Sequence, residues 1–151
     1  MKKIILSLSL FFASNYLFSQ NIELIKGVYY ANKQLYTGIY KVNYPNGSAK
    51  EQLLIKNGLL DSISFYYHEN SKIKTQESYK NGLKDGKWME WDDRGNKLSE
   101  AYYKDNLKDG RWMIWDSNGI QRYDMYYKMG IKTGKWIIWD EKGTIVTEKT
   151  F

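Results

Sequence analysis

Residues 85–92 read DGKWMEWD, residues 109–116 read DGRWMIWD and residues 133–140 read TGKWIIWD. Each segment starts 24 residues after the one before, and the three align without gaps. A fixed period of this length indicates a repeat architecture in which every unit is one small supersecondary element. The fold class therefore depends on the structure of a single 24-residue unit.

Further positions recur with the same step. A second glycine follows the first by nine residues, and an aromatic residue followed by Lys precedes each next unit. We predict structural turn roles for the recurring glycines: Gly86, Gly95, Gly110, Gly119, Gly134 and Gly143. The pattern predicts five units, with starts near residues 38, 62, 86, 110 and 134, and a capping half-repeat over residues 20–37.

One unit is predicted to be a β-hairpin. Residues 86–92 are aromatic and apolar, and residues 92–95 read DDRG, in which Asp bonds backbone N–H groups and Gly accepts a positive φ. Such a loop fits a hairpin closed by a G1 bulge. Residues 97–104 form the return strand and residues 105–109 the next turn. The expected fold is all-β: an elongated, single-sheet antiparallel meander of about ten strands.

The chain has 14 Tyr and 6 Trp, and every Trp falls within the last three units. A regular strand would place Trp88 and Trp91 on opposite faces, whereas a bulge between them would place both on one face. The candidate binding or packing columns are Trp88, Trp112 and Trp136; Trp91, Trp115 and Trp139; and Tyr79, Tyr103 and Tyr127. Either each ring packs on the equivalent ring one unit away, or an exposed column binds a glycan or peptide.

A single-layer sheet with two apolar faces needs something to cover one of them. Strong curling of the sheet, a homodimer and a bound ligand are the open alternatives.

Residues 1–19 resemble a secretory signal peptide, with Lys2 and Lys3 ahead of a mostly apolar stretch and cleavage expected near Ser19. An uncleaved anchor is the alternative. The expected location is the periplasm, the cell surface or the medium. The chain has no Cys, so disulfides, thiolate metal sites and a lipid-anchored N-terminal Cys are excluded.

The formal charge is +6, and the basic residues are interleaved with acids. A nucleic-acid site would be clustered, so no nucleic-acid partner is expected. No enzyme, cofactor or metal site is expected either. His68 and the acids Asp92, Asp116 and Asp140 sit at turn entries, and Glu100, Asp124 and Glu148 recur too regularly for an active site, which is normally unique within an array.

Residues 79–88 read YKNGLKDGKW and have the spacing aromatic, x, x, Gly, x, x, x, Gly, x, aromatic. This spacing resembles the MORN repeat in its bacterial variant form, over roughly residues 36–151. Units three to five match well and units one and two are degenerate. Ser62, Ser71 and Asn106 stand where glycine is expected, which leaves the geometry of their turns open.

The resemblance implies a scaffold or association module with no catalytic residues, and membrane-lipid contact is proposed for some members. Similar proteins are often labelled antitoxin components. The predicted function is a non-enzymatic exported module for protein–protein interaction or scaffolding, with an unknown protein partner. The alternatives are an envelope glycan- or lipid-binding protein that uses exposed Trp columns, and an antitoxin or immunity protein.

Overall fold

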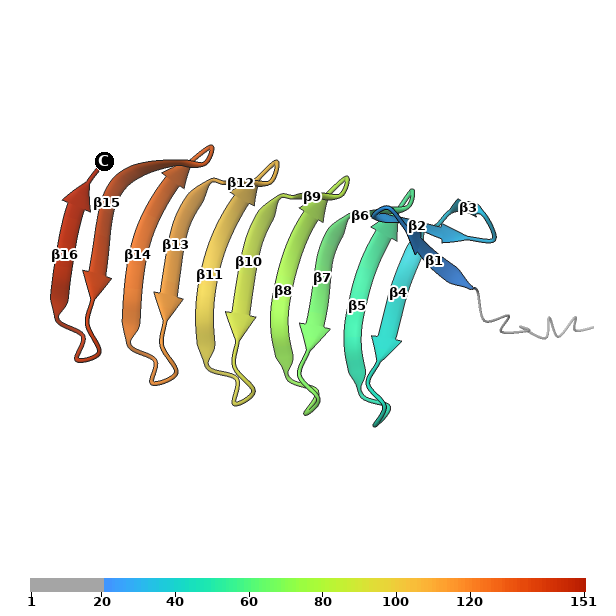
Figure 1. The fold of residues 1–151 in the computed structure, drawn as a ribbon, viewed down its shortest axis with the longest axis horizontal. Coiled ribbons are helices and arrows are strands. Elements are labelled where there is room, and N and C mark those ends of the chain that lie inside the picture. The colour runs from blue at the N-terminus through green and yellow to red at the C-terminus, as the bar shows by residue number, and fades with distance from the viewer. Residues whose placement is uncertain (1–20) are drawn as a thin grey trace, which may run out of the picture.

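The computed structural model describes residues 21–151, and the predicted signal peptide lies outside the described residues. These residues form one long antiparallel sheet and a small three-stranded sheet (Figure 1). Ten strands follow one another across the long sheet in chain order. The prediction of a single-sheet meander of hairpins is therefore confirmed.

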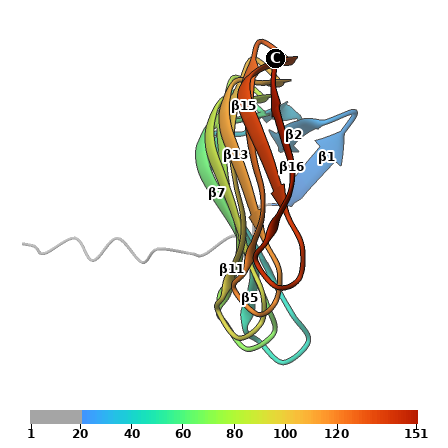
Figure 2. The ribbon, with the colours of Figure 1, turned by 90° about the vertical axis from the view of Figure 1, so that its left-hand side faces the viewer.

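Five long hairpins build the main sheet. They are β4 (Gly38–Asn43) with β5 (Ala49–Lys56), β7 (Ser62–Tyr67) with β8 (Ile73–Lys80), β10 (Gly86–Trp91) with β11 (Lys97–Lys104), β13 (Gly110–Trp115) with β14 (Gln121–Lys128), and β15 (Ile131–Trp139) with β16 (Ile145–Thr150). In side view the sheet is a single layer, and the small sheet projects from one of its faces (Figure 2).

The turns inside the hairpins have the predicted geometry. The N–H of Gly95 donates to the carbonyl of Asp92 at 3.0 Å, and Gly95 has a φ of 94°. Ser71 occupies the same position in the second hairpin with a φ of 66°. Replacement of glycine by serine therefore leaves this turn unchanged, at the cost of a left-handed backbone that glycine adopts without strain.

The turns between hairpins are more elaborate than the predicted turn over residues 105–109. Asp105 and Asn106 both have positive φ, at 47° and 68°, which is the two-residue type I′ geometry. Asn106 thus keeps the turn that Gly82 makes one unit earlier. After each of the first three turns a two-residue strand pairs back on the return strand; these strands are β6 (Leu59–Leu60), β9 (Leu83–Lys84) and β12 (Leu107–Lys108). After the fourth turn, this pairing is made by the first residues of β15.

The register decides the faces of the sheet. β10 and β11 share six residue pairs, and the shift between Glu90 and Trp91 places the extra residue, Leu98, on β11. β10 itself stays regular, so Trp88 and Trp91 lie on opposite faces. Among the first four hairpins, neighbours share only two pairs, as in Met89 with Gln76 and Glu90 with Thr75, whereas β14 and β15 share five.

Residues 22–35 form the separate sheet of β1 (Ile22–Ile25), β2 (Val28–Ala31) and β3 (Gln34–Leu35). Tyr29 of β2 packs with Leu53 and Ile55 in the main buried cluster, and its ring lies 5.3 Å from that of Tyr40. The segment therefore covers one face of units one and two and does not pair with β4. That it caps the array stays a prediction.

Successive units are also linked at both ends of the strands. At one end, the N–H of Gly82 donates to the carbonyl of Leu60, and Asn106 repeats this with Lys84. At the other end, Nε2 of His68 donates to the carbonyl of Trp91 at 2.9 Å. His68 therefore joins two turns, and each unit is stabilised by its neighbours.

Candidate binding surface

One face of the sheet carries a continuous row of aromatic rings, which we call the aromatic ladder. It comprises Tyr79, Trp88, Tyr103, Trp112, Tyr127, Trp136 and Phe151. Ring centroids are 4.9 to 5.7 Å apart, and neighbouring rings are tilted by 56° to 65°. Trp88 and Trp112 each pack between two Tyr rings, and Trp136 packs between Tyr127 and Phe151, so the expectation that each ring packs on the equivalent ring one unit away is wrong. Tilted contacts of this kind are the favoured arrangement of aromatic pairs.

The three Trp rings of the ladder are held by their polar edges. The indole N–H of Trp88 donates to the carbonyl of Ser78 at 3.0 Å, and Trp112 and Trp136 repeat this bond with Tyr102 and Tyr126. Each acceptor lies ten residues earlier, on the return strand of the preceding unit. The ladder is therefore a rigid surface whose ring orientations are fixed before any partner arrives.

A row of lysines lies over the ladder. Nζ of Lys84 is 4.2 Å from the centroid of Trp88, Nζ of Lys108 is 3.9 Å from Trp112, and Nζ of Lys132 is 4.6 Å from Trp136. Within residues 21–151, none of these three amines forms an ion pair with a carboxylate. The ladder face therefore presents one unpaired cation per hairpin, about 10 Å apart.

A groove of about 520 Å³ opens on the ladder face over units three and four, with Thr75 and Glu77 of unit two at its edge. The side chains that matter for its shape are Trp88, Glu90, Ala101, Tyr103, Trp112 and Ile114. Ala101 forms the floor and is 8% exposed. Leu53 and Met125 hold the equivalent position in units one and four, so the groove lies where the sheet has its smallest apolar side chain at this position.

The ladder face of unit two differs from that of the later units. Ser64 stands where units three to five have Trp; it is fully buried, and its Oγ has no hydrogen-bond partner among residues 21–151. Next to it, Glu77 accepts a hydrogen bond from Tyr79 at 2.7 Å. Burial raises the pKa of Glu77, against the opposing hydrogen bonds from Tyr79 and Thr75. The row of aromatic rings therefore has no member at this position of unit two.

The opposite face carries ion pairs. Glu100 accepts from Lys87 at 3.0 Å and from Lys97 at 2.9 Å. Arg111 binds both oxygens of Asp124, at 2.8 and 2.7 Å. Burial raises the pKa of Glu100, but the two amines outweigh it and lower that pKa. The recurring acids predicted to be structural are thus partners of basic residues on the same strand or on the adjacent one.

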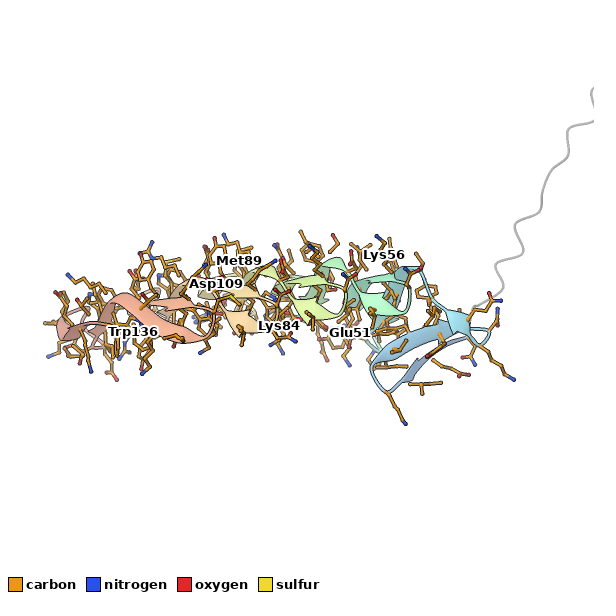
Figure 3. The ribbon with its side chains drawn as sticks, turned by 90° about the horizontal axis from the view of Figure 1, so that it is seen from above. Glu51, Lys56, Lys84, Met89, Asp109 and Trp136 are labelled. Carbon is orange, nitrogen blue, oxygen red and sulfur yellow. The ribbon has the colours of Figure 1, made fainter. Side chains whose placement is uncertain are left out.

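The second Trp column, Trp91, Trp115 and Trp139, also belongs to this opposite face and is half-buried. Nζ of Lys97 lies 5.5 Å from the ring of Trp115. Figure 3 shows the two faces: Lys84 and Trp136 point to the side from which β1–β3 project, and Met89 points away from it. The two Trp columns therefore do not form one site.

The recurring acids at the turn entries cap the loops. Oδ1 of Asp92 accepts the N–H groups of Arg94 and Asn96 at 3.0 and 2.8 Å. Burial raises the pKa of Asp92, but the side-chain and backbone amides of Asn96 outweigh it and lower that pKa to about 2. Gly86 and Gly110 are the first residues of β10 and β13, and Gly134 lies within β15, so these three glycines belong to strands and not to turns as predicted. Their φ values are nevertheless positive, at 105°, 120° and 63°.

Among the described residues, no group of three His, Asp or Glu side chains converges as a metal site. Residues 21–151 also contain no helix long and apolar enough to cross a membrane.

Two features of the binding surface were missed from the sequence. Lys84, Lys108 and Lys132 recur with the 24-residue step and were therefore visible as a third column. Ala101 is recognisable as the smallest residue in a series that reads Leu53, Glu77, Ala101, Met125 and Lys149. The sequence alone could not place either feature beside the ladder, because that depends on the register of the hairpins.

The described residues thus define a tandem hairpin-repeat protein with one rigid aromatic face. Residues 60–81 and 84–105 match the family model of the MORN repeat variant, which agrees with the resemblance noted in the sequence. The matches fall on units two and three, so unit two is recognisable although its spacing looked degenerate. No curated protein matches the sequence. MORN repeats are generally protein- or membrane-interaction modules and generally not enzymes.

Proposed function

We propose that the chain is a non-enzymatic, exported interaction module that binds a protein partner on the ladder face of units three to five. The observation that carries this proposal is that the ladder face is covered in units one and two but not in units three to five. In units one and two the small sheet lies on it, with Tyr29 only 8% exposed. In units three to five the same face has no covering layer within residues 21–151 and holds the 520 Å³ groove.

The cover of units one and two supports a polypeptide as the partner. A β-sheet already packs on this face, and its Tyr29 ring lies 5.3 Å from Tyr40, much as Tyr79 lies 5.4 Å from Trp88. The ladder face therefore accepts an aromatic side chain from a second layer. An uncovered apolar face of this kind is typical of interaction sites. Residues 1–19 support a location outside the cytoplasm.

Neighbouring positions on β13 allow a direct test. A photo-crosslinking phenylalanine analogue replaces either Ile114 on the ladder face or Met113 on the opposite face, in cells that make the protein. We expect a specific protein adduct from position 114 and none from position 113. Equal adducts from both positions, or adducts from 113 alone, would contradict the proposal.

An anionic glycan or lipid headgroup is the second candidate, favoured by the unpaired row of Lys84, Lys108 and Lys132. Cations at about 10 Å spacing attract a polyanion in a salt-dependent manner. The test compares wild type with a variant in which all three lysines are replaced by Gln, using anionic vesicles and a soluble acidic polysaccharide. The control replaces the exposed Lys26, Lys33 and Lys56 instead. Equal loss in both variants would indicate attraction by net charge only.

A further inference from the structure

The chemical character of the groove over Ala101 changes from one end to the other. At one end, Nζ of Lys84 lies 5.0 Å from the centroid of Tyr103, and Nζ of Lys108 lies over Trp112. At the other end, the exposed carboxylate of Glu90 lies within 3.5 Å of the hydroxyl of Ser99. The apolar hollow over Ala101 lies between these ends. The groove is therefore cationic, apolar and anionic in order along the strands.

The register gives the spacing of these three parts. Tyr103 pairs with Lys108, Ala101 pairs with Trp88, and Ser99 pairs with Glu90. Successive parts are thus two residues apart on β11, which corresponds to about 7 Å. An extended strand that lies along the groove presents alternate side chains at the same spacing. Its residues i−2, i and i+2 would meet the lysines, the hollow and Glu90.

We infer that the groove binds an extended partner strand with an acidic, an aromatic and a basic side chain at alternate positions. The aromatic ring fills the hollow over Ala101, the carboxylate lies between Lys84 and Lys108, and the basic side chain meets Glu90. This inference rests on the proposed function and specifies its partner. The groove volume lies within the range of about 300–1,000 Å³ typical of ligand pockets.

Charge and burial favour this partner over a purely apolar one. The two lysines have no carboxylate partner in the described part of the chain, so an incoming acid pairs with them without breaking an ion pair. Glu77 also lines the groove; burial raises its pKa, and the nearby positive charge of Lys84 opposes that rise. A partner carboxylate would take the place of that weak, longer-range interaction.

Ala101 is the specificity-determining residue in this arrangement. Methionine stands at the equivalent position in unit four, as Met125, and is buried there. The substitution Ala101→Met therefore fits the repeat while it fills the hollow. Gln76→Met is the matched control, because it adds the same side chain on the opposite face of β8, where Gln76 pairs with Met89.

The test uses the full-length protein and the capped peptide Asp-Ser-Tyr-Ser-Lys, with binding followed by NMR of the indole N–H groups. We expect a dissociation constant on the order of millimolar, because a free peptide loses conformational freedom on binding. Shifts should appear at Trp88 and Trp112 and be absent at Trp91 and Trp139. Ala101→Met should weaken binding at least about tenfold, and Gln76→Met should not.

Two further peptides complete the test. Asp-Ser-Ala-Ser-Lys should not bind, because it lacks the aromatic ring. Lys-Ser-Tyr-Ser-Lys should not bind either, because it lacks the carboxylate. The inference is overturned by shifts at Trp91 or Trp139 alone, by equal binding of the alanine peptide, by unchanged binding to Ala101→Met, or by no binding at all. If position 114 still crosslinks a protein in those cases, the proposed function stands and only the partner chemistry is wrong.

Discussion

The ladder face is closed in units one and two and open in units three to five, although both regions are built from the same hairpin. In the closed region Ser64 replaces a ladder Trp, and Leu53, which is 2% exposed, contacts Tyr29 of the small sheet. In the open region the ladder is continuous and the groove lies over Ala101. A few side chains on a constant backbone therefore decide whether this face is core or surface.

Weakening the contact between the small sheet and the ladder face should have the largest effect on stability. Tyr29→Ala deletes a ring that is 8% exposed among Leu53, Ile55 and Tyr40. We expect the free energy of unfolding to fall by about 3 kcal/mol, as is usual for a buried aromatic side chain. Urea unfolding followed by circular dichroism measures it, with Tyr30→Ala, one residue along β2, as the control. Equal losses in the two variants would mean that the small sheet does not cap the array.

The glycine that opens β13 should accept a side chain poorly, because its neighbours lie close. Gly110 has a φ of 120°, and an added Cβ would lie 3.0 Å from Cβ of Tyr102. Gly110→Ser should therefore cost about 2 kcal/mol, from backbone strain and crowding together. Gly119→Ser is the control, because nothing lies within 4 Å of its Cβ and Ser71 already occupies the equivalent position. A thermal unfolding series would contradict the assignment if both variants lost the same stability.

Two carboxylates should respond to pH with opposite sign. Burial raises the pKa of Glu77 above 4.5, so its contribution to stability is present below that pH and is lost as the pH rises through the folded value. Glu77→Gln should therefore gain about 1 kcal/mol or less at neutral pH, since the group is only half-buried. This gain should disappear in acid.

Glu100 is the comparison for that experiment. Its hydrogen bonds from Lys97 and Lys87 lower its pKa, so its contribution is present above 4.5 and is lost as the pH falls through the folded value. Glu100→Gln should therefore be less stable than wild type at neutral pH, with the difference shrinking in acid. The test measures the urea midpoints of both variants and of wild type from acidic to neutral pH. Stability changes of the same sign for Glu77→Gln and Glu100→Gln at neutral pH would contradict the prediction.

Restoring the glycine of the regular units should have the smallest effect. Ser62 opens β7 with a φ of 77°, a conformation that costs less for glycine. Ser62→Gly should gain about 0.5 kcal/mol, because the greater freedom of glycine in the unfolded chain offsets part of the relief. Differential scanning calorimetry would register a small rise in the unfolding temperature. A fall would show that Ser62 makes a contact that offsets its strain.

The sequence was sufficient for the local structure. Gly95 and Asp92 predicted the loop because their chemistry acts within four residues. The sequence left open whether Trp88 and Trp91 lie on opposite faces or on the same face, because a bulge between them would bring both to one face. The structure settles this through Leu98, which lies on the partner strand and so leaves β10 regular.

Contacts between segments that are distant in the chain could not be predicted from the sequence. Tyr29 packs with Ile55, which lies 26 residues later in the chain. No periodicity links these two residues, because the first belongs to the irregular segment. The groove could not be predicted either, because it depends on the small side chain of Ala101. A repeat pattern identifies residues that recur, and it does not reveal a position where side-chain volume is lacking.

The links between units connect only nearest neighbours, as the bond from His68 to the carbonyl of Trp91 illustrates. Loss or duplication of one whole hairpin during evolution would therefore leave both ends of the array intact and change its length by about 10 Å. A single-residue insertion within a strand would instead exchange the two faces from that point onward. Selection on this gene is thus expected to accept length changes in steps of 24 residues and to remove most others.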